Sequence, residues 1–153
     1  MTTTPTTVVP ASPLVQRWLA FVRAFGQPCF VGWPDDGVVI WLQWHARHGS
    51  LVVIHQGEEI LGLAVGWQCH GHELEQHWYA DNPAGDCFYF AHCIATSPVA
   101  MAELVAELAR RKPQWRTLKL YWRRAGRGLV PVRAAAITKL FSLAQRRALK
   151  HES

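Results

Sequence analysis

The segment from Cys87 to Trp122 constrains the fold more than any other part of the chain. Its first stretch, Cys87–Ala95, is apolar and aromatic except for His92, which is typical of a strand buried on both faces of a sheet. A helical apolar stripe follows until Pro113, and from Trp115 to Trp122 the apolar residues alternate as in a second strand. Strand, helix and strand in this order predict two parallel strands joined by a right-handed crossover.

Thr96, Ser97 and Pro98 stand between the first strand and the helix. Ser97 is a favoured N-cap residue, and Pro98 suits the first helical position. The crossover therefore leaves backbone amides of a helix start at the carboxyl end of a strand, where α/β proteins tend to bind anionic groups. Two interpretations are open: Thr96 and Ser97 hold a phosphate or a thioester carbonyl, or they serve only to begin the helix.

The rest of the pattern predicts elements that surround this unit. They are helices over Ser12–Gly26 and Asp35–His48, a hairpin of Leu51–Ile54 with Ile60–Trp67, a loop with a short helix or frayed strand over Gln68–Asp86, and a final helix from about Pro131. We therefore expect one α/β domain over residues 12–153, with helices flanking a mixed sheet, after a flexible tail of residues 1–11.

Charge is distributed unevenly along the chain. Residues 1–100 carry three Lys or Arg against eight Asp or Glu, a net charge of −5, whereas residues 101–153 carry thirteen against three, a net charge of +10. A basic C-terminal third suits an acidic partner, although ordinary solvated helix faces produce the same pattern. Nucleic acid is the less favoured partner, because the aromatic residues that interleave with the arginines fit a core better than a base-stacking surface.

Arg123, Arg124 and Arg127 surround a glycine-rich turn after the second strand of the central unit. Guanidinium groups match the geometry of phosphate oxygens. These arginines, together with Arg133, are therefore candidates for binding pantetheine phosphates, an acidic carrier protein or nucleic acid.

His92 is the candidate catalytic residue. A neutral imidazole has an unperturbed pKa of about 6.5, close to operating pH, and can accept a proton from a lysine amine. Strict alternation along the strand places His92 on the side of Phe88, Phe90 and Ile94, with Cys93 on the opposite side. The alternative is a core histidine held by hydrogen bonds, since buried polar groups usually find partners.

The four cysteines of the chain show no CxxC spacing, which favours reduced thiols in a cytoplasmic protein. Cys93 is a weak candidate for an acyl-accepting thiolate, because buried cysteines are usually inert. Zinc takes sulfur and imidazole ligands, but no metal site is expected, because the spacing of the nearby candidates matches no zinc motif. These candidates are Cys69, His70, His72, His77 and Cys87. Neither a signal peptide nor a membrane span is expected from the apolar runs.

The order of these elements resembles the acetyltransferase-like (GNAT) fold. Within that fold the chain is most similar to the toxin-activating lysine acyltransferases, the bacterial enzymes that fatty-acylate internal lysines of pore-forming toxins. Four segments carry the similarity: Ser12-Pro13-Leu14 with Arg17 and Trp18, the hairpin strand Ile60–Trp67, the strand Phe88–Ala95, and the helix that ends in Arg110-Arg111-Lys112-Pro113.

The resemblance implies transfer of an acyl group from a thioester, acyl-CoA or acyl carrier protein, to an amine of a protein or small molecule. It also implies a homodimer without a tightly bound cofactor. Where those enzymes have the catalytic histidine after the Ser-Pro-Leu segment, this chain has Val15, and where they have a catalytic aspartate it has His92. The glycine-containing phosphate loop of acetyltransferases is missing too, because Ile94–Ala100 contains no glycine.

Two functions are consistent with these observations. The first is an acyltransferase in which His92 is the base, and the Ser97 helix start holds the donor. The second is a non-catalytic module of the same fold that binds an acidic partner through its basic C-terminal third.

Overall fold

A computed structural model describes residues 12–25, 30–74, 81–124 and 128–152 of the chain. In chain order the elements are α1 (Pro13–Phe25), α2 (Asp35–Arg47), β1 (Leu51–Gln56), β2 (Glu59–Cys69), the short 3₁₀ helix η2 (Gly71–Glu73), β3 (Cys87–Ala95), α3 (Pro98–Arg110), the 3₁₀ helix η3 (Trp115–Thr117), β4 (Lys119–Arg124), β5 (Gly128–Val132) and α4 (Ala134–Glu152). The predicted tail of residues 1–11 lies outside the described residues.

The strands form one five-stranded mixed sheet in the order β1-β2-β3-β4-β5. β3 and β4 are parallel, and the other neighbouring pairs are antiparallel. The prediction of an α/β fold with a parallel strand pair joined through a helix is therefore confirmed, since α3 connects β3 to β4. None of the helices in the described chain combines the length and the apolar composition that a bilayer crossing requires.

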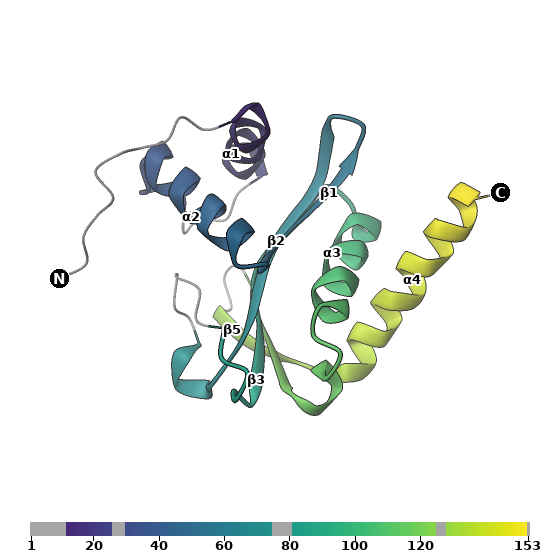
Figure 1. Cartoon of the computed structure of the whole chain (residues 1–153). Helices are drawn as coiled ribbons and strands as arrows, with labels where there is room; N and C mark the ends of the chain where they lie inside the picture. Colours follow the sequence, from purple (N-terminus) through teal and green to yellow (C-terminus); the bar gives the residue numbers. More distant parts are fainter. Residues whose placement is uncertain (1–11, 26–29, 75–80, 125–127, 153) are drawn as a thin grey trace.

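Helices cover both faces of the sheet, as Figure 1 shows, with α1 and α2 on one side and α3 on the other. α4 packs against the outside of α3. The buried side chains accordingly form two clusters. The α1/α2 core includes Val22, Trp41, Leu63, Trp67 and Tyr89, and the α3/α4 core includes Phe88, Phe90, Leu104, Leu108 and Ile137.

The predicted helix start at Ser97 is confirmed in detail. The Ser97 hydroxyl accepts a hydrogen bond from the amide of Ala100 at 3.1 Å, and Pro98 occupies the first turn. α1 begins in the same way, because the Ser12 hydroxyl accepts from the amide of Val15 at 3.3 Å. These side chains satisfy amides that would otherwise lack intrahelical partners, so both boundaries could be predicted from sequence.

The region around the last strands differs from the prediction. Residues 115–117 form η3 instead of strand, so β4 begins only at Lys119, and the final helix begins at Ala134 and not near Pro131. Pro131 instead lies in the unpredicted strand β5, which pairs with β4 at the edge of the sheet. A proline is tolerated there because an edge strand does not need every amide for pairing.

The segment Gln68–Asp86 differs from the predicted loop at its start, because β2 extends through its first two residues to Cys69. The Gln68 side chain anchors the later part of this segment, since its Nε2 donates to the carbonyls of Pro83 at 3.2 Å and Gly85 at 2.7 Å. Gly85 packs so closely that a Cβ atom there would lie 2.4 Å from the carbonyl carbon of Cys69. Residues 83–85 are therefore held against the end of β2 by hydrogen bonds from the Gln68 side chain and by the close approach of the Gly85 and Cys69 backbones.

Candidate functional site

β4 pairs with only part of the β3 edge that faces it. β3 pairs with β4 from Cys87 to Phe90, whereas its pairing with β2 continues to Ala95. In the described chain, therefore, no strand pairs with the β4-facing edge of residues 91–95, which we call the open β3 edge. It leads directly into the capped start of α3.

A β-bulge in β3 changes which way His92 points. Val65 pairs with His92 and the next residue, Gly66, pairs with Phe90, so Ala91 has no partner of its own on β2. A bulge places one extra residue on one strand and interrupts the alternation of side chains. The predicted placement of His92 beside Phe88 and Phe90 is therefore wrong.

The packing on the two faces shows the result of this bulge. Phe88 and Phe90 lie in the α3/α4 core, whereas Ala91 lies in the α1/α2 core. The His92 ring lies on that same α1/α2 side, where its centroid is 4.9 Å from Phe30 and 5.2 Å from Trp41. Ile94 shares this side with His92, as predicted.

His92 is therefore an enclosed histidine, only 4% exposed, in an aromatic surrounding. Trp41 makes an edge contact with it and a second one with His45, at 4.6 Å between ring centroids. The His45 Nδ1 lies 2.7 Å from the Ser50 hydroxyl, which itself donates to the His45 carbonyl at 3.2 Å. Because that hydroxyl has a single proton, we assign the proton of this contact to His45 Nδ1.

His45 and Ser50 were not among the predicted site residues. Their only sequence signal is the spacing of Trp41 and His45 by one helical turn, which places both rings on one face of α2. Ser50 begins the chain segment that returns to β1, and its pairing with His45 depends on the turn at Gly49, which has a φ of +74°. A positive φ favours glycine, because glycine has no Cβ atom to clash with the backbone.

Arg123 reaches the same side of the sheet from β4. Its Nε donates to the hydroxyl of Tyr89 at 3.0 Å, and Tyr89 is a buried member of the α1/α2 core. The ring of Tyr89 packs edge-on against Trp67 at 5.4 Å. The structure thus brings Arg123 to the face of β3 that carries His92. The side chain of Arg124 and all of Arg127 lie outside the described residues.

The helix start offers few free groups. Pro98 has no amide proton, Ala100 donates to the Ser97 hydroxyl, and Met101 donates to the Ser97 carbonyl at 3.0 Å. Both the amide and the hydroxyl of Thr96 donate to the Leu61 carbonyl, at 2.9 and 3.0 Å. The Thr96 hydroxyl therefore ties β3 to β2, and Ser97 acts as a cap.

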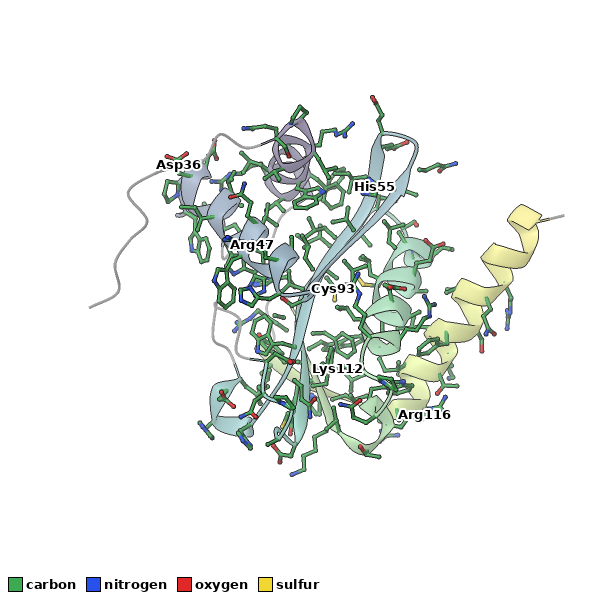
Figure 2. The ribbon with its side chains drawn as sticks, in the orientation of Figure 1. Asp36, Arg47, His55, Cys93, Lys112 and Arg116 are labelled. Atoms are coloured by element: carbon green, nitrogen blue, oxygen red, sulfur yellow. The ribbon has the colours of Figure 1, made fainter. Side chains whose placement is uncertain are left out.

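Cys93 points to the opposite side, toward α3, as Figure 2 shows. Burial raises the pKa of its thiol to about 12. At neutral pH the thiol is therefore protonated, which argues against a thiolate nucleophile at this position.

The described side chains among the candidate zinc ligands lie near the end of β2, where no metal site was predicted. Among the described residues, no three His, Cys, Asp or Glu side chains are grouped so that they could hold a metal ion. His70 and His72 stack on each other at 5.6 Å, and His77 lies outside the described residues.

A cavity of about 200 Å³ lies on the other face of the sheet, at the C-terminal end of α3. Its lining consists of His48, Gly49, Ser50, Gly66, Asp81, Phe88, Leu108, Arg111 and Lys112. Lys112 pairs with Asp81 at 2.8 Å, and Arg111 donates to the carbonyls of Gly49 and Leu51 at 2.8 and 2.9 Å. The cations of this cavity are thus used within the fold, which argues against an anion site.

The basic C-terminal third divides into paired and exposed groups. Arg110 and Arg111 form ion pairs with Glu107, and Lys119 pairs with Asp86. The exposed group, which we call the basic surface, forms no ion pair with the residues that the structure describes. It consists of Arg116, Arg133, Lys139 and Arg146.

Comparisons with family models, with curated proteins and with solved structures find no match to this chain.

Proposed function

We propose that this protein is an acyltransferase of the acetyltransferase-like type, which transfers an acyl group from a thioester donor to an amine of a protein or small molecule. The observation that carries the proposal is the open β3 edge. At this edge β3 has no neighbouring strand beyond Phe90 in the described chain, and the histidine turned by the bulge at Ala91 lies in this stretch, directly before the start of α3.

The open β3 edge suits the donor chemically. Acyl-CoA and acyl carrier protein both present the acyl group on a phosphopantetheine arm, which contains two amide groups. A strand edge that lacks a neighbouring strand can bind an extended amide-containing ligand in the manner of an added strand. Arg123 brings a positive charge to the same face of the neighbouring strand β4, where its Nε donates to the Tyr89 hydroxyl.

His92 is the proposed base. The amine nitrogen attacks the thioester carbonyl and gives its proton to the imidazole. The C–N bond forms as the C–S bond breaks, the sulfur leaves as a thiolate with the electron pair of that bond, and the imidazolium then returns the proton to give the free thiol. His92 is only 4% exposed, so this step requires the amine at the open β3 edge to come within hydrogen-bond reach of the ring, directly or through one water.

Thermal unfolding in the presence of thioester donors tests this function. A donor at about 100 times its Kd stabilises the folded state by about 2.7 kcal/mol, which for a chain of this size raises Tm by about 5–10 °C. We expect this rise with acyl-CoA or with acyl carrier protein, and a smaller rise with the corresponding donor that lacks the acyl group. An unchanged Tm with every donor would exclude the proposal.

The basic surface supports a second candidate, a non-catalytic module that binds an acidic partner. Its members Arg116, Arg133, Lys139 and Arg146 are exposed on η3, α4 and the residue before α4. Binding to an acidic protein that weakens steeply with added salt, without any change in Tm from thioester donors, would favour this candidate.

A further inference from the structure

Cys69 and Cys87 lie directly opposite each other at the end of the β2–β3 pair. Both side chains belong to the α1/α2 core, so they are on the same face of the sheet. Directly opposed residues in antiparallel strands have Cα atoms about 4.5–5.5 Å apart, and a disulfide requires about 4.4–6.8 Å. The backbone therefore already has the spacing that a cross-strand disulfide needs.

The two thiols are free and enclosed, with exposures of 0% for Cys69 and 2% for Cys87. Because both residues are enclosed, a bulky adduct such as glutathione has little room at either sulfur. An oxidised sulfur at either position has the other cysteine directly opposite it on the neighbouring strand.

Cys87 is the thiol that a small oxidant reaches first. Its Sγ donates to the Asp86 carboxylate at 3.4 Å, and the Asp86 side chain is 59% exposed, so this thiol faces the solvent side of the pair. Burial, with a contribution from Asp86, raises the pKa of Cys87 to about 11, and burial raises that of Cys69 to about 12. Both thiols are consequently protonated at neutral pH and react slowly with an oxidant, Cys69 more slowly than Cys87.

We propose that Cys69 and Cys87 form an intramolecular disulfide when the folded protein is exposed to hydrogen peroxide. The Cys87 sulfur attacks the peroxide O–O bond, which gives a sulfenic acid and the first water. The Cys69 sulfur then attacks the sulfenic sulfur, the S–S bond forms, and the second water leaves. Two thiols are oxidised and one peroxide is reduced to two waters.

The disulfide would close the loop of residues 70–86 and join the ends of β2 and β3 covalently. A bridge over a loop of this length restricts the unfolded chain, and we expect Tm to rise by about 5–10 °C, reversibly on addition of dithiothreitol. This inference does not depend on the proposed acyltransferase function, because neither cysteine takes part in the proposed chemistry.

Peptide mapping without reduction tests the proposal. The intact protein is treated with hydrogen peroxide, the remaining thiols are alkylated, and cross-linked peptides are identified by mass spectrometry. We expect a Cys69–Cys87 link with a loss of about 2 Da, also in Cys93→Ser, and no such link in Cys87→Ser.

Three results would overturn the proposal. They are a link between other cysteines, a sulfinic or sulfonic acid at Cys69 or Cys87 without the link, or an unmodified pair under conditions that oxidise the urea-unfolded chain completely. Each is observed in the wild-type protein, so the test holds even where a variant folds poorly.

Discussion

Alanine in place of His92 is expected to reduce the rate of acyl transfer by at least about 100-fold, the usual loss when a general base is removed. His92 is the titratable side chain that the bulge at Ala91 turns to the α1/α2 side of the open β3 edge. The measurement is kcat/KM for release of the donor thiol, in His92→Ala and in wild type.

His55 provides the matched control for this experiment. It is an exposed histidine on β1, distant in the fold from the β3–β4 boundary, and Figure 2 shows it near the β1–β2 turn. His55→Ala should keep the wild-type rate. If His92→Ala also keeps it while the protein unfolds cooperatively, His92 has no part in the mechanism.

Trp41→Ala is expected to cost about 3–5 kcal/mol in the free energy of unfolding, the range for removing a fully buried aromatic side chain. Trp41 is 0% exposed, and its ring contacts Phe30 at 5.2 Å as well as both buried histidines, His45 and His92. The void would open at the centre of the surroundings that hold the proposed base. Urea unfolding measures the loss.

Trp44→Ala is the comparison for that measurement. Trp44 lies on the same helix but is only half-buried, and its ring lies at a tilt against the exposed His48, with 4.1 Å between the ring centroids. Its removal should cost about 1 kcal/mol. An equal or larger loss for Trp44→Ala than for Trp41→Ala would contradict the described core. Should Trp41→Ala fail to fold, Trp41→Phe gives the graded comparison, with a smaller loss.

The central strand, turn and helix could be predicted from sequence because their signals are local. Ser97 and Pro98 determine where α3 begins through contacts within one turn. The apolar run of β3 is longer than an exposed strand would carry, and this run predicts a buried strand. The structure confirms its predicted boundaries at Cys87 and Ala95. The hairpin of β1 and β2 could be predicted for the same reason, with Gly57 at its turn.

The incorrect predictions, for the face of His92 and for the place of Pro131, concern features that the two-residue alternation of side chains along a strand does not reveal. The bulge at Ala91 depends on how β3 meets β2, and it moves His92 away from Phe88 and Phe90. Pro131 signals a helix start when considered alone, whereas its place at the sheet edge depends on β4. Such pairings are tertiary, so no local pattern predicts them.

The candidate site could be predicted only in part for the same reason. His92 and Arg123 were identified by residue type, but their approach to one face of β3 required the bulge and the hydrogen bond to Tyr89. The contact between His45 and Ser50 likewise depends on the turn at Gly49, which the sequence suggests only as a helix end.

Hydrogen exchange of the donor complex is the sharpest test of donor binding at the open β3 edge, because it locates the donor without requiring the acceptor. With acyl-CoA or acyl carrier protein bound, the amides of residues 91–95 and of the first turn of α3 should exchange more slowly, while those of β1 remain unchanged. Protection confined to η3 and α4, or no protection along the open β3 edge in a complex that does form, would show that the donor binds elsewhere.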